Sequence, residues 1–496
     1  MSLLKSLAKD TALYGLSSMV GRFLNYLLVP LYTAVMPAAT GEYGVVNHMY
    51  GYVALVLVVL TCGMETTFLR WAGKEGQDVR RLYSTALMVV GTLSALFLAA
   101  CFACLGPLSA ALGYGAHPEF IAMMAVVVAL DAVSNVPFVY LRYQKRALRF
   151  AVLKLTNILI NIGLNLFVFL LCPRIHAVHP EWIAWFYESD YLAGYVFAIN
   201  LVTSLATLVL LWPEVRQFRW GFDGTLVRSM LRYSYPIVLL GLAGVVNQAA
   251  DKILVPMLIP GREGLVQLGI YNAAAKIAMI MAMATQAFRY AYEPIVFGRR
   301  REGGRTPEQV NVVGTRYFVL FTLLGFLAVM AWIDPIKVLL IRNEDYWEGL
   351  RVVPIVMLAE ILMGIYFNFS FWYKLTDETL WGALFSFVGC AVLVAVYVFF
   401  VPTYGYMACA WAGVAGYGTC MLLSYAVGQR RHPIPYAVRS MLAYAAVAAT
   451  LYGLMLLVPA GWGTVAGTAA KTAIVGVYAA IIYFKEKHSS REQLSR

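Results

Sequence analysis

Fourteen long apolar segments alternate with short polar connections along this 496-residue chain, and this alternation decides what it can fold into. A helix that crosses a bilayer needs about 20 mostly apolar residues. The segments that meet this requirement lie near 13–36, 44–69, 82–104, 119–141, 151–172, 191–212, 234–258, 269–296, 313–332, 352–373, 380–401, 406–428, 439–459 and 463–484. Only 13% of the residues are charged, which excludes a soluble multidomain enzyme and a disordered scaffold. We predict an all-α polytopic membrane protein with 14 transmembrane helices.

Basic residues mark one side of these predicted spans. If the N-terminus lies in the cytoplasm, the inner connections carry 26 Lys and Arg residues and the outer connections carry 5. Lysine and arginine accumulate on the cytoplasmic side of membrane proteins, so we expect both termini to be cytoplasmic. The same distribution explains the net charge of +12 through topology and anionic lipids, so no nucleic-acid partner is expected.

Two sequence motifs recur in register in the two halves of the chain. Leu28-Val29-Pro30 returns as Leu254-Val255-Pro256, and Gly44-x-x-Asn47 returns as Gly269-x-x-Asn272. The matching helices are odd-numbered and run in the same direction, which indicates parallel repeats. We therefore predict two parallel six-helix bundles related by a pseudo-twofold along the membrane normal, plus two C-terminal helices. The expected domains are an N-terminal lobe at 1–225 with an interfacial N-terminal helix, a C-terminal lobe at 226–432, and spans 13 and 14 with a cytoplasmic tail at 433–496.

Charged residues within the spans are mostly basic. The basic ones are Arg22, Lys154, Lys252, Lys276, Arg289, Arg316 and Lys471, and the acidic ones are chiefly Asp131, Asp251 and Glu360. A charge at the bilayer centre costs about 2.5–3.5 kcal/mol, so such residues normally face protein or a water-filled cavity. We therefore predict a cationic cavity between the two lobes.

Polar residues at helical spacing mark one face of spans 1, 5 and 7. The residues predicted to bind a substrate in the cavity are Arg22, Asn25, Lys154, Asn157, Asn161, Asn247, Gln248, Lys276 and Arg289. Asp251 is the predicted ion-coupling residue, because a carboxylate near mid-membrane can bind a proton or a sodium ion.

Each of these assignments has a structural alternative. Lys154, Arg289 and Arg316 lie near the inner boundary, where their long side chains can reach the headgroups instead of the cavity. The asparagines of span 5 can join helices to one another. Asp251 can form a static ion pair with Arg22 or Lys276. For Lys471, in the appended helices, a structural role is favoured.

Neither a metal site nor an enzyme centre is expected. Cys101 and Cys104 form a CxxC pair, but they lie in an apolar run without polar ligands, and His176 and His179 lie in a loop. The sequence contains no recognisable nucleophile with a base and no paired carboxylates on a loop. We predict no metal, no cofactor and no catalytic residues.

The first span and the segment after it carry a family pattern, Gly21-Arg22-Phe23 to Pro30-Leu31-Tyr32 followed by Gly41-Glu42-Tyr43-Gly44-Val45. With these motifs and its span count, nearly the whole chain resembles the multidrug/oligosaccharidyl-lipid/polysaccharide exporter superfamily, and within it the polysaccharide transporter group that includes bacterial O-antigen flippases. The resemblance implies a flippase that moves an undecaprenyl-pyrophosphate-linked oligosaccharide from the inner to the outer leaflet by alternating access. In related lipid II flippases two extra helices are thought to form a groove for the lipid tail, and spans 13 and 14 would serve likewise.

The resemblance also implies a location and partners. We expect a multi-pass protein of the cytoplasmic (inner) membrane of a bacterium. The expected partners are a lipid-linked oligosaccharide, membrane lipids, a proton or sodium ion, and polysaccharide polymerase or assembly proteins.

Two other classes of protein remain as alternatives. An ion-coupled drug or cation exporter of the same superfamily would place acidic residues in the cavity, whereas deep bases outnumber deep acids here. A membrane polysaccharide polymerase or ligase would carry a large outer loop with polar catalytic residues, and the outer loops here are short.

Overall fold

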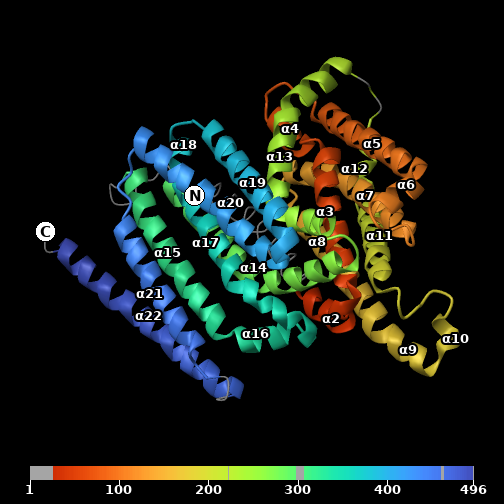
Figure 1. Cartoon of the computed structure of the whole chain (residues 1–496). Helices are drawn as coiled ribbons and strands as arrows, with labels where there is room; N and C mark the ends of the chain where they lie inside the picture. The colour runs from red at the N-terminus through yellow and green to blue at the C-terminus, as the bar shows by residue number, and fades with distance from the viewer. Residues whose placement is uncertain (1–25, 220, 222, 298–305, 460–462, 495–496) are drawn as a thin grey trace. The chain divides into compact units, whose positions relative to one another are not determined.

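The structure is a computed structural model that describes residues 26–219, 221, 223–297, 306–459 and 463–494. It is built of helices joined by short connections (Figure 1). The helices are α2 (Leu28–Val35), η1 (Ala38–Thr40), α3 (Glu42–Thr61), α4 (Met64–Ala72), α5 (Val79–Ala103), α6 (Leu105–Ala111), α7 (Pro118–Tyr143), α8 (Ala147–Leu166), η2 (Phe167–Leu171), α9 (Cys172–Val178), α10 (Pro180–Ile183), α11 (Leu192–Leu210), α12 (Trp212–Val215), α13 (Gly224–Leu258), α14 (Arg262–Phe297), α15 (Pro307–Ala331), α16 (Ile333–Leu340), η4 (Glu344–Val352), α17 (Val353–Phe369), α18 (Phe371–Leu375), α19 (Leu380–Tyr404), α20 (Tyr406–Arg431), α21 (Val438–Leu456) and α22 (Gly463–Leu494).

Thirteen helical segments of the described residues are long and apolar enough to cross a membrane. They correspond one by one to the second to fourteenth predicted spans, so the prediction of an all-α polytopic membrane protein is confirmed. The first predicted span, 13–36, falls mostly outside the described residues, and α2 is the part of it that the structure describes. The total of fourteen spans therefore stays a prediction.

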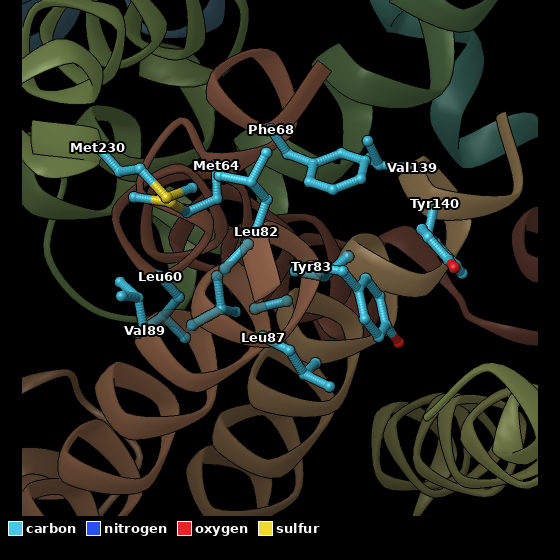
Figure 2. Close-up of a cluster of buried hydrophobic side chains, with 14 of the residues drawn as sticks. Leu60, Met64, Phe68, Leu82, Tyr83, Leu87, Val89, Val139, Tyr140 and Met230 are labelled. Carbon is cyan, nitrogen blue, oxygen red and sulfur yellow. The ribbon is translucent and has the colours of Figure 1, made fainter. Parts of the chain in front are cut away.

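The chain divides into two compact units, Met1–Gly269 and Ile270–Arg496. The first unit has a continuous apolar core in which α3, α4, α5, α7 and α13 meet (Figure 2). Leu60, Met64 and Leu82 are almost completely buried there, and the rings of Tyr83 and Tyr140 lie 4.4 Å apart. Burial of these large side chains fixes how the helices of this unit pack. The predicted lobes, 1–225, 226–432 and 433–496, were defined by repeat symmetry and stay predictions.

Glycines allow α13 to pack closely along α3 within the first unit. A Cβ atom at Gly51 would lie 2.7 Å from the Cβ of Lys252, which is closer than side chains approach one another. Further along, a Cβ at Gly44 would overlap the carbonyl oxygen of Leu265 at the start of α14. The seventh predicted span therefore packs closely against the second, and the backbone at the start of α14 lies against α3, as small residues permit in membranes.

In the second unit α15 packs against α17, α21 and α22, and α20 packs against α17 and α19. The α19–α20 contact again depends on glycine, because a Cβ at Gly389 would overlap the sulfur of Cys420. The two C-terminal helices are thus attached to the second unit through α15.

Polar caps begin two of the helices that follow connections rich in basic residues. Asp78 accepts hydrogen bonds from the backbone of Arg80 and Arg81 at the start of α5, and Asp223 caps α13 in the same way. A carboxylate at this position satisfies free backbone N–H groups and interacts favourably with the helix dipole. The hydrogen bond from the Thr225 hydroxyl, with the backbone hydrogen bonds, lowers the pKa of Asp223.

Candidate functional site

A ladder of hydrogen-bonded polar side chains runs through the first unit between α8 and its neighbours. Its rungs are Asn157 to Thr207 of α11 at 2.5 Å, Asn161 to Asn200 of α11 at 3.2 Å, and Tyr32 of α2 to Asn165 at 2.8 Å. Asn165 also donates to the Asn161 carbonyl oxygen at 2.8 Å, and Asn200 donates to the Tyr50 hydroxyl of α3 at 2.7 Å. We call these residues the polar ladder. The predicted asparagine stripe exists, and each of its side chains bonds to another helix.

The charged end of this stripe lies beside an acidic residue. The Lys154 ammonium lies over the ring of Phe138, 4.1 Å from its centroid, and its charge interacts with that of Asp131 on α7. Asp131 accepts a hydrogen bond from the Ser204 hydroxyl at 2.7 Å. An ammonium over an aromatic face is stabilised by the ring quadrupole, so Phe138 helps to hold Lys154 within the helix bundle.

Ion pairs close the end of the first unit at which α7 ends and α8 begins. Arg142 pairs with Glu65, and Arg149 pairs with Glu214, whose side chain is only 1% exposed. These basic residues were predicted only as inner-loop charges. The structure gives both of them partners on other helices, α4 and α12.

The polar residues of α13 are exposed to different degrees. Asp251 is 8% exposed, Asn247 is half-buried and Gln248 is exposed. The Leu-Val-Pro repeat aligns Gln248 with Arg22 and Asp251 with Asn25, and both of these span 1 residues lie outside the described residues. The alternative of a static ion pair between Asp251 and Arg22 therefore stays a prediction.

The remaining predicted site residues belong to the second unit. Lys276 and Arg289 lie on α14, both half-buried, and the Arg289 guanidinium lies 4.7 Å from the centroid of the Phe367 ring of α17. Glu360 lies on the same helix as Phe367, two turns before it. Two of the predicted binding residues, both basic and on α14, thus belong to the same unit as the span carboxylate Glu360 on α17.

Lys471 of α22 has a structural partner. Its ammonium lies 3.0 Å from Asp334 of α16, which also pairs with Lys337 at 2.8 Å. Burial alone would raise the pKa of Asp334, but the hydrogen bonds from the two lysines outweigh this effect and hold the pKa below its ordinary value. The ion pair joins an appended helix to the rest of the second unit.

The histidines and cysteines that the sequence singled out do not gather. His179 pairs with Glu181 and stacks on Trp182, His176 lies near Tyr187, and Cys101 is buried whereas Cys104 is exposed. Within the described part of the chain, no three His, Cys, Asp or Glu side chains form a group that could hold a metal ion.

Sequence reasoning missed several members of the site. Asn200 and Thr207 bond to predicted site residues but were not predicted themselves. Tyr50, which bonds to Asn200, and Ser204, which bonds to the span carboxylate Asp131, were not predicted either. Asn200 carried a signal, since it is an amide within an apolar span, like the asparagines of span 5. The two hydroxyl residues of span 6 carried none, because serine and threonine are common in membrane helices.

A family model described as "Polysaccharide biosynthesis protein" matches residues 7–289, more than half of the chain. The chain belongs to this family. The predicted membership of the exporter superfamily is therefore confirmed. No match was found among curated proteins.

Solved structures of two kinds of transporter share the fold of this family member. The lipid II flippase MurJ, in an inward closed conformation, matches with a TM-score of 0.70 and 12% identity over 95% of this chain and 99% of that chain. An inward-facing multidrug resistance MATE family transporter of the MOP superfamily matches with a TM-score of 0.61 and 13% identity over 83% and 94%. The MATE multidrug transporter DinF-BH matches with a TM-score of 0.58 and 14% identity over 86% and 96%. At these identities the likeness shows the fold, and the chain is a membrane transporter of the superfamily by family and by fold.

Proposed function

We propose that this protein is a flippase that moves an undecaprenyl-pyrophosphate-linked oligosaccharide from the inner to the outer leaflet of a bacterial cytoplasmic membrane. The observation that carries the proposal is the family match over residues 7–289, in a chain whose fold is shared with a lipid II flippase. On this view two six-helix lobes enclose a cationic cavity and open it alternately to either side. Both termini lie in the cytoplasm.

The chemistry of the span residues supports an anionic substrate. Arg289 and Lys276 on α14, and Lys154 on α8, are basic side chains at positions within the spans. Arginine holds a pyrophosphate through two parallel hydrogen bonds, and lysine acts as a point charge. Asn25, Asn157, Asn161, Asn247 and Gln248 are the amides that we assign to the sugar hydroxyls, and Arg22 is the residue that we assign to the pyrophosphate.

The polar ladder qualifies the role of two of these amides. Asn157 and Asn161 already bond to α11, so sugar binding there requires that a sugar hydroxyl replace or share an existing partner. On α13, Asn247 is half-buried and Gln248 is exposed.

Net export also needs a source of energy or a means of removing the product. We assign ion coupling to Asp251, whose carboxylate can take up a proton or bind sodium together with neighbouring amide oxygens. Removal of the product by a polysaccharide polymerase or assembly protein in the outer leaflet would pull the equilibrium in the same direction. Spans 13 and 14 are assigned to the lipid tail.

An ion-coupled drug or cation exporter is the second candidate function. The fold shared with MATE multidrug transporters favours it. The excess of bases over acids within the spans disfavours cationic substrates. A polymerase or ligase is the weakest candidate, because transporters of this superfamily are generally not enzymes.

The test uses proteoliposomes that contain a polyprenyl-pyrophosphate-linked sugar with a nitrobenzoxadiazole label, and dithionite reports how much label faces outward. Arg22→Ala should abolish translocation while the protein still inserts. Arg22→Lys should restore translocation only in part, because a lysine ammonium cannot form the two parallel hydrogen bonds of a planar guanidinium. Arg80→Ala, at an exposed position on α5, is the matched control and should translocate normally. Normal translocation by Arg22→Ala contradicts the assignment of Arg22. Export of a cationic dye by the wild type, without sugar-lipid translocation, would instead support the second candidate.

A further inference from the structure

Asp131 is a carboxylate in the middle of a membrane-spanning helix. It is the fourteenth of the 26 residues of α7, so about 20 Å of helix separate it from each end. The Ser204 hydroxyl of α11 donates to its Oδ1 atom at 2.7 Å. No basic group of the described residues lies within ion-pair distance of it. A carboxylate with a single hydroxyl partner is costly to keep ionised at this depth.

Lys154 is the basic group whose charge acts on Asp131. It lies on α8 and contacts the Phe138 ring, which leaves its ammonium hydrogens without a carboxylate partner among the described residues. The charges of Asp131 and Lys154 therefore interact with each other without forming an ion pair. In a medium of low dielectric this interaction is stronger than in water, and it disappears when one of the two groups becomes neutral.

Few other titratable groups face this pair. Tyr50 of α3 interacts with Asp131, and Arg142 of α7 and Glu65 of α4 interact with Lys154. Arg142 and Glu65 form an ion pair with each other, so their charges largely cancel at the position of Lys154. α11 contributes the Ser204 hydroxyl. The ionisation of Asp131 thus decides whether the charge of Lys154 is balanced.

We propose that Asp131 is a proton-titrated counterion that controls the affinity of Lys154 for the anionic headgroup of the substrate. Ionised Asp131 neutralises the field of Lys154. When Asp131 takes up one proton and becomes a carboxylic acid, Lys154 is left with an unbalanced positive charge that phosphate oxygens can bind. This inference rests on the proposed function, because it takes Lys154 to be a substrate contact.

The local chemistry favours a proton over a sodium ion. The neighbouring ammonium repels a metal cation, and one hydroxyl beside one carboxylate is a poor set of ligands for sodium. A proton needs no further ligand. The Ser204 hydroxyl donates to the carboxylate and so favours its ionised form over the carboxylic acid.

The inference can be measured because proton binding and anion binding are thermodynamically linked. If protonation of Asp131 strengthens anion binding, anion binding must strengthen proton binding by the same factor. Proton and lipid pyrophosphate are therefore taken up together. The affinity should rise as the pH falls, by up to about tenfold per pH unit for one linked proton.

The experiment is isothermal titration of the full-length protein in detergent with geranyl pyrophosphate, over a range from mildly acidic to mildly basic pH. Titration in buffers of different ionisation enthalpy counts the protons taken up. The wild type should bind more tightly at lower pH and take up a fraction of one proton per ligand. Asp131→Asn should bind tightly at every pH, with only the dependence due to the ligand itself and no uptake by the protein. Asp345→Asn, at an exposed position in η4, is the control and should keep the wild-type behaviour.

Three outcomes distinguish the possibilities. Asp131→Asn with the wild-type slope and proton uptake overturns the proposal. If Asp131→Asn does not fold, Ser204→Ala gives the answer, because loss of the hydrogen bond to the carboxylate should move the pH midpoint upward, and an unmoved midpoint overturns the proposal. If Lys154→Met binds the ligand with unchanged affinity, Lys154 does not contact the ligand, and the proposal is overturned. The flippase function itself is tested separately by Arg22→Ala.

Discussion

Arg149 and Glu214 form a two-point ion pair in which Nε lies 2.6 Å from Oε1 and Nη2 donates a 2.9 Å hydrogen bond to Oε2. The pair joins α8 to the short helix α12, and the Glu214 side chain is 1% exposed. A carboxylate buried to this degree persists because a planar guanidinium faces both of its oxygens. The contact therefore fixes the start of α8, the helix that carries the polar ladder.

Removal of Arg149 should destabilise the protein strongly. Loss of one partner of a fully buried pair costs about 3–5 kcal/mol, and because the Arg149 side chain is 39% exposed we expect the lower end of this range for Arg149→Met. Thermal unfolding in detergent measures the change. Arg81→Gln removes the equivalent partner of the exposed Arg81–Asp223 pair and should shift the midpoint far less. Equal shifts for the two variants would contradict the importance of burial.

Close packing at Gly44 should not tolerate a methyl group. Gly44→Ala places a Cβ against the backbone carbonyl of Leu265, which no rotamer change relieves, and overpacking of this kind costs about 1–3 kcal/mol. The yield of folded protein and its unfolding midpoint should both fall. Gly91→Ala, in the helix α5 where a Cβ meets open space, is the matched control. A stable Gly44→Ala protein would mean that α3 and α14 can separate at this point.

The spans could be predicted from sequence because their signal is local. The segment predicted at 380–401 is observed as Leu380–Tyr404, since an uninterrupted apolar run fixes a membrane helix by its own composition. The fifth span was predicted to end at 172 but continues to Val178, because the polar residues after it form helix as well. Local composition therefore predicts that a span exists more accurately than it predicts the residue at which the span ends.

The partners within the site could not be predicted in this way. The asparagine stripe of α8 follows from helical periodicity, but its contact with Asn200 depends on which face of α11 packs against α8. The orientation of α11 results from the packing of the whole unit. It produces no sequence periodicity that would link two residues 39 positions apart. The same reason explains why Glu214 was not recognised as the partner of Arg149.

The predicted orientation can be tested by labelling loop cysteines in a variant whose seven native cysteines are replaced. Ala116→Cys, before α7, should react with an impermeant maleimide applied to intact cells, because the charge distribution places this connection outside. Gln77→Cys, before α5, should react only after the cells are permeabilised. Both side chains are exposed, and both sites avoid the neighbouring glycines Gly113 and Gly76, which have positive φ angles. The reverse pattern of labelling would invert the topology.

The coupling role of Asp251 can be separated from a static role by neutralising it. If the carboxylate binds the coupling ion, Asp251→Asn should lose the dependence of transport on the proton or sodium gradient while it still binds substrate. If Asp251 is instead a static partner of Arg22 or Lys276, the same change should lower stability, and a second variant that neutralises the base should restore it. Transport and unfolding midpoints distinguish the two. A stable Asp251→Asn protein with normal gradient dependence would eliminate the coupling role.

The attachment of α22 should depend on pH through Asp334. Hydrogen bonds from Lys337 and Lys471 hold the folded-state pKa of Asp334 below its ordinary value of 3.8, although burial alone would raise it. A depressed carboxyl pKa contributes stability that is fully present above the ordinary value and is lost as the pH falls through the folded-state value. Asp334→Asn should therefore unfold at a lower temperature than the wild type near neutral pH, and the difference should vanish in strong acid, where both side chains are neutral. Lys471→Met should show a smaller loss, because the contact of Asp334 with Lys337 at 2.8 Å remains. A difference between Asp334→Asn and the wild type that stays constant down to low pH would show that the two lysines do not stabilise the ionised carboxylate.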